Sequence, residues 1–497
     1  MPLKSRSGFA MVSCRRLFAL LALLVGAVGP VGRAAAQQAF ELTDLGTLGG
    51  TTSIGHGIND SGQVVGDSTI AGTGATHAFL YSQGTMTDLG TLGGTTSSAS
   101  GINNSGQVVG FAEATAGGVG HATIWNNGTI TDLDPNGTTG SSGSGINNLG
   151  QVVGATADPN NPNNPFGAVA TLWSGGTAST LMVNSAQDDT GSQAYGINDS
   201  GEIVGSVYNH TVMHDSAVVW TSSAGVYTGP PCCGYGGKAY AINSSNAIVG
   251  QVVFSLPYYN AFAWSSGEMP TRLTTLDGVV ASSAAYGINA SGEIVGEDDT
   301  TGTARATLWP SGSTPAVDLN TTLRPSVAST VTLTLASGIN VDGLIVATGT
   351  ITATAATHAF LLTPVTMPGP PSVTLSATPR SVAVGQSFTV NWSSTNTWAC
   401  SADGSGPNGP PWSGPVATSG NKSIAAGATV GTLTLTLTCS FGNQSANAQT
   451  AVTVEVMQNK PSSGGGGMLD WMTLTALASM GSFTHIVRRR RPDRTNP

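Results

Sequence analysis

Seven copies of one ten-residue phrase lie along the middle of the chain. The first copy is GINDSGQVVG, and later copies such as GINNLGQVVG and GINASGEIVG differ from it at two or three positions. Such repetition indicates an architecture built from one small structural unit that packs against its own copies. The repeat unit is 44 to 51 residues long, because the copies begin at Gly57, Gly101, Gly145, Gly196, Ala241, Gly287 and Gly338.

Each repeat unit contains four segments with the pattern of β-strands. In the first unit they are SIGHGIN, GQVVGDS, HAFLYS and TMTDLG, which are short, rich in β-branched or alternating apolar residues, and bounded by turn formers. The Asn-Asp-Ser-Gly between the first two segments is a tight-turn sequence, since Asn and Asp tolerate left-handed backbone and Gly adopts it freely. Four antiparallel strands every 40-odd residues predict the blade of a β-propeller. The expected fold class is therefore all-β, with a seven-bladed β-propeller over residues 41–364.

The two ends of the repeat region predict how the ring closes. A fourth-strand sequence, TDLG at Thr43, precedes the first unit, whereas the last unit ends at HAFLL from His358 without a fourth strand of its own. Residues 42–46 are therefore expected to pair beside residues 358–362, which leaves no open sheet edge between the first and last blades.

The repeated phrase itself is predicted to be scaffold. We expect GIN to open the innermost strand, where small residues suit the crowded centre, with DSG as the turn and QVVG as the second strand. Asn59 and Asp60 carry oxygen atoms of the kind that Ca²⁺ binds. The copies vary among Asp, Asn, Ala and Ser at this turn, however, so no metal site is predicted.

Two signatures give the repeat region a family resemblance. The third strand begins His-Ala-Phe at His77 and His358 and His-Ala-Thr at His121, and the fourth strand recurs as TDLG or TDLD. Residues 41–364 thus resemble the bacterial HAF-repeat extracellular proteins. The resemblance implies secretion and brings no assigned activity. We expect the shared histidines to serve packing or hydrogen bonding at a strand edge rather than catalysis.

The N-terminal 36 residues have the composition of an export signal. Basic residues up to Arg16 precede an apolar run over residues 17–28, and three alanines ending at Ala36 form a site for signal peptidase. Met11 is an alternative start that would shorten the signal. The mature chain is then expected in an oxidising compartment that permits disulfides.

The body of the chain is acidic. Between residues 37 and 467 there are 7 Lys and Arg against 24 Asp and Glu. Nucleic-acid binding is not expected, because phosphate neutralisation needs a basic surface.

After a proline-rich linker over residues 365–371, the segments SVTLSATP, SFTVNWSS, TLTLTLTCS and TAVTVEV predict a small β-sandwich at residues 372–456. The stretch TVNWSSTNTWAC, followed by Trp412-Ser413-Gly414 and TLTC, resembles bacterial immunoglobulin-like modules. The resemblance implies a disulfide between Cys400 and Cys439, and a role as a spacer.

The C-terminus is predicted to be a membrane segment. A glycine-rich linker at 457–467 ends in Gly464, Gly465, Gly466 and Gly467, residues 468–487 are mostly apolar and long enough to cross a bilayer, and 488–497 form a basic cytoplasmic tail. This arrangement resembles the GlyGly-CTERM sorting signal. The resemblance implies transient inner-membrane anchoring, cleavage near the glycines by a rhomboid-type protease, and release to the cell surface, outer membrane or medium. The alternative is an ordinary membrane anchor.

No catalytic motif was found, so the candidate site rests on the loops that vary between repeats. These loops join second to third strands and fourth to first strands, and they emerge on one face of a propeller. Adjacent Cys232 and Cys233 would be a vicinal disulfide, a metal-thiolate pair or free thiols. The acidic stretch from Glu297 and the pair at Asp188 would hold a cation or form a solvated rim, and the latter is preferred. The candidate binding residues are Tyr235, Tyr258, Tyr259, His214, Asp215, Glu297 and Asp298.

The sequence therefore favours an exported, surface-displayed, non-enzymatic binding or adhesion protein without a cofactor, whose ligand is an extracellular glycan or protein. The tyrosines would stack on a sugar or peptide, although exposed tyrosines also occur without a ligand. The alternative is a secreted polysaccharide hydrolase or lyase that uses loop carboxylates such as Asp215, Glu297 or Asp298.

Overall fold

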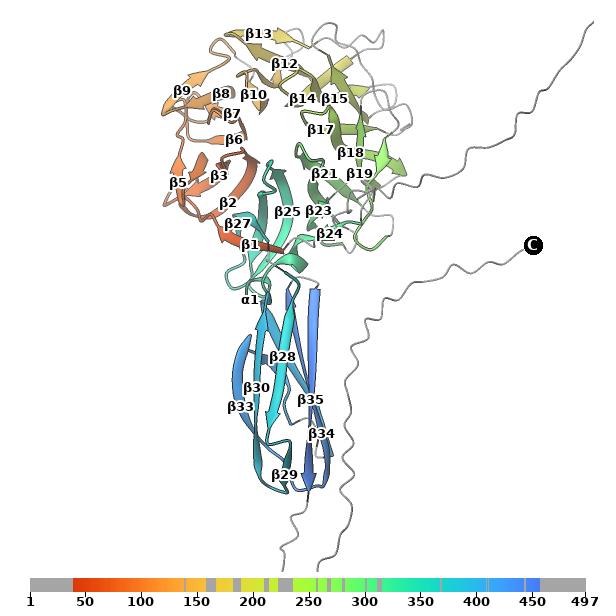
Figure 1. Cartoon of the computed structure of the whole chain (residues 1–497). Helices are drawn as coiled ribbons and strands as arrows, with labels where there is room; N and C mark the ends of the chain where they lie inside the picture. Colours follow the sequence, from red (N-terminus) through yellow and green to blue (C-terminus); the bar gives the residue numbers. More distant parts are fainter. Residues whose placement is uncertain are drawn as a thin grey trace, which may run out of the picture.

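A computed structural model describes residues 39–455 apart from 138–139, 158–166, 182–188, 210–213, 222–235, 256–257, 266–269, 279–281, 300–301, 311–314, 367–368, 408, 410 and 442–443. The described residues are organised almost entirely in β-strands (Figure 1). The helical elements among them are two single turns, η1 (Leu319–Thr322) and α1 (Pro325–Ala328). The chain is thus all-β in the part that the structure describes.

Seven antiparallel sheets cover the repeat region, and each one corresponds to a repeat unit. Sheet 1 has β2 (Gly49–Ile58), β3 (Val64–Ile70), β4 (Thr76–Ser82) and β5 (Thr85–Asp88). Sheet 2 has β6 (Ser97–Ile102), β7 (Val108–Glu113), β8 (Gly120–Asn126) and β9 (Thr129–Asp132). Sheet 3 has β10 (Ser141–Ile146), β11 (Val152–Ala157), β12 (Ala168–Ser174) and β13 (Thr177–Thr180). Sheet 4 has, among described residues, β14 (Asp189–Ile197), β15 (Ile203–Asn209) and β16 (His214–Trp220).

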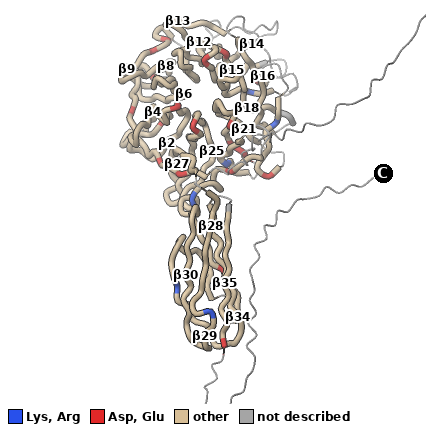
Figure 2. Tube along the Cα trace, in the orientation of Figure 1, with Lys and Arg blue, Asp and Glu red and all other residues tan. Residues whose placement is uncertain are grey.

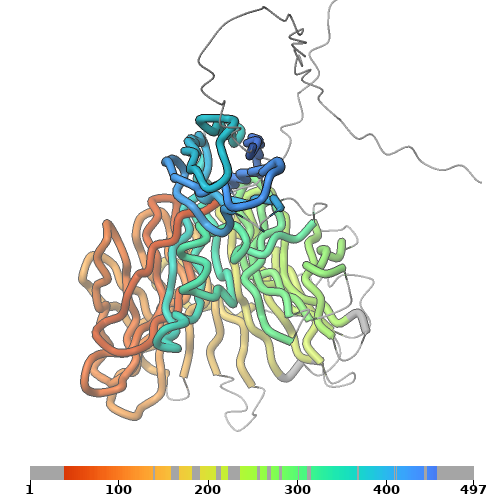
Figure 3. The backbone as a smooth tube through the Cα atoms, turned by 90° about the horizontal axis from the view of Figure 1, so that it is seen from below, coloured from red at the N-terminus to blue at the C-terminus, as the bar shows by residue number. Residues whose placement is uncertain are grey.

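The remaining sheets of the repeat region continue this order. Sheet 5 has β17 (Gly237–Ile242), β18 (Ala247–Ser255), β19 (Tyr258–Ser265) and β20 (Thr271–Arg272). Sheet 6 has β21 (Ser283–Ile288), β22 (Ile294–Asp298), β23 (Arg305–Trp309) and β24 (Val317–Asp318). Sheet 7 has β25 (Val331–Ile339), β26 (Ile345–Ile351), β27 (Ala356–Val365) and β1 (Ala39–Asp44). In Figure 3, seen from below, the strands of successive sheets stand side by side.

The last sheet is completed by the N-terminal strand. Strand β1 pairs antiparallel with β27, so that Leu42 lies opposite Leu362 and Asp44 lies opposite Phe360. The prediction that residues 42–46 lie beside residues 358–362 is thereby confirmed for Leu42 to Asp44. The two ends of the repeat region share one sheet, although about 320 residues separate them.

A closed cycle of side-chain hydrogen bonds links all seven sheets. In every copy of the phrase the buried Asn donates from Nδ2 to the backbone carbonyl of the corresponding Asn in the next sheet, over 3.0 to 3.2 Å. The last of these bonds runs from Asn340 to the carbonyl of Asn59, in the first sheet. The seven donors are Asn59, Asn103, Asn147, Asn198, Asn243, Asn289 and Asn340. The repeated Asn is therefore a link between sheets as well as a turn residue.

The first glycine of the phrase lies close to the first glycine of the phrase in the neighbouring sheet. A Cβ built on Gly57 would lie 3.3 Å from the Cα of Gly101, and one on Gly287 would lie 3.1 Å from the Cα of Gly338. The expectation that GIN opens the innermost strand was wrong, because β2 ends at Ile58, inside the phrase. The strand must end there because Asn59 begins the turn, in which the Gly62 amide donates to the Asn59 carbonyl.

Apolar side chains fill the spaces between sheets. Between sheets 1 and 2, Val65 and Ala78 pack with Ala99, Val108 and Trp125, and all five are buried. Between sheets 1 and 7, Val64 and Phe79 pack with Val346 and Ala359. The first and last sheets are therefore held by packing as well as by hydrogen bonds.

Residues 372–455 form two further sheets, which we call the stalk (Figure 1). Apolar residues from both sheets, including Phe388, Val390, Leu435 and Val452, form one buried core. The first sheet has β28 (Ser372–Thr378), β30 (Ser387–Thr395) and β33 (Ser419–Ala425). The second has β29 (Ser381–Ala383), β31 (Ala399–Ser405), β32 (Gly414–Val416), β34 (Gly431–Phe441) and β35 (Gln444–Glu455).

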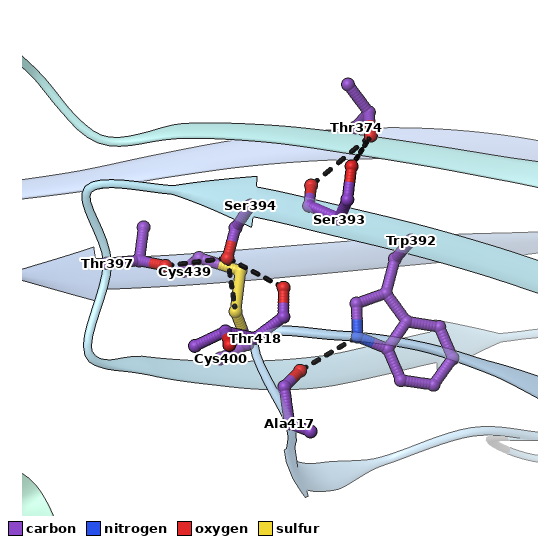
Figure 4. Close-up of a disulfide and its surroundings, with 9 residues drawn as sticks. All are labelled: Thr374, Trp392, Ser393, Ser394, Thr397, Cys400, Ala417, Thr418 and Cys439. Atoms are coloured by element: carbon purple, nitrogen blue, oxygen red, sulfur yellow. Dashed lines mark hydrogen bonds between the residues drawn. A yellow bond between two sulfur atoms is a disulfide. The ribbon is translucent and has the colours of Figure 1, made fainter.

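The disulfide expected from the sequence is present in the stalk. Cys400 and Cys439 lie directly opposite each other on β31 and β34 and are joined through their sulfurs (Figure 4). The bond therefore connects adjacent strands of one sheet. The Ser394 hydroxyl lies beside it and donates to the Thr418 carbonyl at 2.8 Å.

Arg324 lies between the repeat region and the stalk. Its guanidinium forms an ion pair with Glu41 at 2.6 Å and lies 5.1 Å from the ring centre of Trp398 in the stalk. No helix in the described part of the chain is long and apolar enough to cross a membrane. The predicted signal at residues 1–36, the Gly464–Gly467 run and the expected helix at residues 468–487 lie outside the described residues.

Candidate functional site

Four of the predicted site residues lie on three neighbouring sheets. Asp215 is near the start of β16, Tyr258 and Tyr259 begin β19, and Glu297 is near the end of β22. These positions belong to the ends from which the variable loops leave the sheets. Tyr258 and Tyr259 are 41% and 46% exposed, which is unusual for large side chains in this molecule. Tyr235, Cys232 and Cys233 lie outside the described residues.

The other two candidates, Asp298 and His214, differ in exposure, since Asp298 is buried and His214 is partly exposed. Asp298 is fully buried, and its carboxylate accepts from the Leu276 amide at 3.0 Å. It therefore supports the following loop and does not present its carboxylate to solvent, contrary to the expectation of a binding residue. His214 lies next to Asp215, and its Nδ1 is 3.3 Å from the Asp215 carbonyl oxygen.

Every innermost strand carries a β-bulge at the same position. In β2 the register shifts between Gly55 and Gly57, so that His56 is an extra residue without a partner on β3. Bulges of this kind redirect a side chain and are common beside functional sites. The extra residues of the seven strands, which we call the bulge ring, are His56, Ser100, Ser144, Tyr195, Tyr240, Tyr286 and Ser337. All seven are partly exposed.

Three consecutive members of the bulge ring are tyrosines in contact. The ring centroids of Tyr195 and Tyr240 are 5.3 Å apart with planes tilted by 59°, and those of Tyr240 and Tyr286 are 5.1 Å apart with a tilt of 43°. These are favourable separations and tilts for aromatic pairs. Sheets 4, 5 and 6 thus share one aromatic row.

Charged side chains surround this aromatic row. The Tyr286 hydroxyl donates to Oε1 of Glu297 at 2.8 Å, and Nζ of Lys238 lies 3.3 Å from Oδ2 of Asp215. Burial lowers the pKa of Lys238, but the neighbouring Tyr195 and Asp215 outweigh it and raise that pKa overall. Lys238 therefore keeps its proton and its ion pair. Figure 2 shows how sparse charged residues are elsewhere on the molecule.

The tyrosines keep their protons. Burial, and then the ionisable groups of Tyr195, Asp215 and Glu297, raise the pKa of Tyr240. Burial and the nearby Glu297 likewise raise the pKa of Tyr286. Both phenols are therefore hydrogen-bond donors across the physiological pH range. Among the described groups, none forms a hydrogen bond with the Tyr240 hydroxyl.

A histidine and a carboxylate are paired on sheet 1. Nε2 of His56 is 2.6 Å from Oδ1 of Asp67, which also accepts from the Ser98 hydroxyl at 3.0 Å. Asp67 occupies the same place on β3 that Glu297 occupies on β22, directly after the last glycine of the phrase. Sheets 1 and 6 thus each carry a carboxylate directly after the last glycine of the phrase.

The histidines of the HAF signature have a structural role at strand edges. Nδ1 of His77 contacts Asp88 at 2.8 Å, and His121 contacts Asp132 at the same distance. His358 contacts Asp44, across the closure of the ring, at 2.9 Å. The partner is in each case the Asp of the TDL signature. The sequence held a signal for this pairing, because the third repeat lacks both the His and the Asp.

The turn of the phrase provides no metal ligand set. Oδ1 of Asn59 accepts from the amides of Ser61 and Gln63, while its Nδ2 donates to Gln63 Oε1 and to the carbonyl of Asn103. Both the oxygen and the amino group of the Asn59 side chain thus form two hydrogen bonds each within the protein. Among the described residues, no group of three or more His, Cys, Asp or Glu is arranged to hold a metal ion.

The bulge ring and Lys238 were not among the site residues predicted from the sequence. The signal was available, because the residue before the phrase is Tyr in three consecutive copies and Ser or His in the others. A difference confined to neighbouring repeats suggests function, whereas a residue shared by all repeats suggests scaffold. What remained invisible was the bulge that brings these residues together.

No family model matches the chain, and no curated protein matches it. Among solved structures, a Mycobacterium tuberculosis puromycin-hydrolyzing peptidase is 12% identical with a TM-score of 0.39, over 65% of this chain and 56% of that one. An extracellular domain from B. thetaiotaomicron is 9% identical with a TM-score of 0.32, over 84% and 59%. The tricorn protease is 8% identical with a TM-score of 0.32, over 80% and 39%. The chain spans less than two thirds of the length of each, and none of these similarities defines a family or an activity for it.

Proposed function

We propose that the chain is an exported, surface-displayed binding protein whose head is a seven-bladed β-propeller of HAF-like repeats. In this proposal residues 372–456 are an immunoglobulin-like sandwich that acts as a spacer, and the C-terminus is a GlyGly-CTERM-like sorting tail. The ligand is an extracellular glycan or protein bound on the face of the long variable loops.

The observation that carries the proposal is the grouping of aromatic and charged residues on sheets 4 to 6. Tyr258 and Tyr259 are exposed, and they begin β19 of the same sheet whose innermost strand, β17, carries Tyr240 of the aromatic row. Exposed aromatic rings bind sugars and peptides well because they offer a large contact area with few rotatable bonds. The rest of the ring supplies a rigid frame for this group.

The stalk supports export. A disulfide between Cys400 and Cys439 is stable in secreted and periplasmic proteins and is rare in the reducing cytoplasm. An exported chain with a terminal two-sheet unit beside its binding head fits display at a distance from the cell.

The alternative, a polysaccharide hydrolase or lyase, requires a pair of carboxyl groups, one with a raised pKa. Among the described carboxyl groups, a displaced pKa is found at Glu113, where hydrogen bonds from Thr95 lower it to about 2. The Glu297 carboxylate accepts a hydrogen bond from the Tyr286 hydroxyl at 2.8 Å, an arrangement that suits the binding of a ligand.

The test is a glycan array combined with a polysaccharide-turnover screen on the intact exported protein. The double substitution Tyr258→Ala and Tyr259→Ala should weaken binding about tenfold or more. Leu149→Ala is the matched control, because Leu149 is 71% exposed on a turn at the opposite end of its sheet. Turnover of a polysaccharide that stops with Glu297→Gln would replace this proposal by the enzymatic one.

Mass spectrometry of the mature protein tests the sorting tail. A C-terminus within or just after residues 464–467 supports cleavage by an intramembrane protease. Mature protein that retains residues 488–497 would instead indicate an ordinary anchor.

A further inference from the structure

The bulge ring is divided into an aromatic half and a small half. Tyr195, Tyr240 and Tyr286 lie on sheets 4 to 6, whereas Ser100 and Ser144 occupy the same position on sheets 2 and 3. A ring that served packing alone would be expected to use similar residues in all repeats. Here three neighbouring positions present aromatic rings and two others present only serine side chains, an asymmetry that suits a ligand bound against one side.

Carboxylates lie beside the aromatic half. Glu297 touches Tyr286 through Oε1, and its second oxygen has no hydrogen-bond partner among the described residues. Asp215 is balanced by Lys238 at 3.3 Å, so Glu297 supplies the uncompensated negative charge beside the tyrosines. The carboxylate of Glu297 is partly exposed and can accept from a ligand.

Aromatic faces beside an uncompensated carboxylate select a particular chemistry. The face of a tyrosine attracts cations as well as the apolar faces of sugar rings. A carboxylate strengthens the attraction to an ammonium group through charge-assisted hydrogen bonds. A neutral sugar would gain from the rings alone, whereas an acidic sugar would be repelled by Glu297.

We propose that the aromatic half of the bulge ring binds an amino-sugar glycan, with its sugar rings against Tyr240 and its neighbours and a protonated amine beside Glu297. This proposal rests on the glycan-binding form of the function proposed above and names the class of glycan. Tyr240 contributes contact area and a hydroxyl that has no hydrogen-bond partner among the described residues, and Glu297 contributes selectivity for the charged amine.

The test compares two oligosaccharides that differ in one group. Glucosamine hexamers and N-acetylglucosamine hexamers share the same backbone, but only the former carry free amines. Binding of each to the intact exported protein is measured by calorimetry at about pH 6, below the pKa of ordinary amines. The glucosamine hexamer should bind about tenfold more tightly, and the difference should shrink at high salt. A lysine hexapeptide is the third probe.

Three substitutions separate the contributions of ring, charge and hydroxyl. Tyr240→Ala should weaken both hexamers about tenfold, whereas Tyr240→Phe keeps the ring and should cost only a few-fold. Glu297→Gln keeps an acceptor for Tyr286 and should abolish the preference for glucosamine while leaving the neutral hexamer unchanged. Leu149→Ala is the control for surface substitutions, and circular dichroism verifies the fold of each variant.

The outcomes are distinguishable. Equal binding of the two hexamers would overturn the amine selectivity and leave glycan binding in place. Tighter binding of the lysine hexapeptide than of either hexamer would overturn the glycan in favour of a basic peptide. Glycan binding that is insensitive to Tyr240→Ala would move the site elsewhere on the head. The absence of any glycan binding would refute this proposal and the glycan-binding form of the proposed function, and would leave a protein ligand as the remaining form.

Discussion

Replacing Asn147 by alanine should weaken the ring of sheets as a whole. Asn147 is 3% exposed, and its side chain makes four hydrogen bonds. Nδ2 donates to the carbonyl of Asn198 at 3.1 Å and to Oε1 of Gln151 at 2.8 Å. Oδ1 accepts from the amides of Leu149 at 3.1 Å and Gln151 at 2.9 Å. The substitution therefore removes one link between sheets 3 and 4 and the internal support of one turn.

The expected loss follows from these four bonds. Each is worth about 0.5–1.5 kcal/mol net, which gives about 2–6 kcal/mol for the set. The amide of Leu149 lies on an exposed turn and can bond to water after the substitution, which reduces the loss. The carbonyl of Asn198 is left in the interface between two sheets without this donor. We therefore expect about 3 kcal/mol, which corresponds to roughly 5–10 °C in the melting temperature of a large domain.

Calorimetry of the thermal unfolding of the head, residues 39–365, measures this effect, with Asn136→Ala as the control. Asn136 is also in a turn but is exposed, so its replacement should change stability by less than about 0.5 kcal/mol. A second variant, Asn147→Asp, keeps the acceptor oxygen but loses the donor toward Asn198. It should be at least as destabilising at neutral pH and should recover in acid, where the protonated carboxyl can donate again.

Two results would refute the reasoning. A melting temperature of Asn147→Ala equal to that of Asn136→Ala would mean that the cycle of hydrogen bonds contributes nothing to stability. An unaffected Asn147→Asp would mean that the turn matters and the bond between sheets does not.

Three further predictions concern other parts of the chain. Cys400→Ser, compared with reduction of the native protein, should destabilise the stalk by roughly 2–5 kcal/mol and leave the head transition in place; a lowered head transition, or free thiols at Cys400 and Cys439 in exported protein, would contradict it. Deletion of residues 42–46 should lower the melting temperature of the head far more than shortening the linker to the stalk, because β27 keeps β26 but loses half of β1, its partner on the other edge. An unchanged value would contradict the closure. The pKa of Glu113 is lowered from 4.5 to about 2 by hydrogen bonds from Thr95. These bonds therefore stabilise the fold above about pH 4.5, and the stabilisation is lost as the pH falls toward 2. Glu113→Gln should remove that part of the acid dependence of the melting temperature.

The repeating frame could be predicted from the sequence. The ten-residue phrase and the strand patterns around it predicted one four-stranded sheet per repeat, and the misplaced TDLG at Thr43 predicted the pairing of β1 with β27. These features are readable because strand alternation and turn chemistry are local, and because repetition multiplies a weak signal. The pairing of Cys400 with Cys439 followed from the resemblance of the stalk to known modules.

The contacts of the repeated and the variable residues became visible in the three-dimensional arrangement of the sheets. Asn59 looks like a turn residue in the sequence, and its bond to the carbonyl of Asn103 appears only when two sheets are placed side by side. Tyr195, Tyr240 and Tyr286 are about 45 residues apart in the chain, and the bulges place them in contact at about 5 Å. Asp298 looked like a surface carboxylate and is buried. Local sequence specifies the strands, whereas contacts between sheets depend on distances that the chain order does not encode.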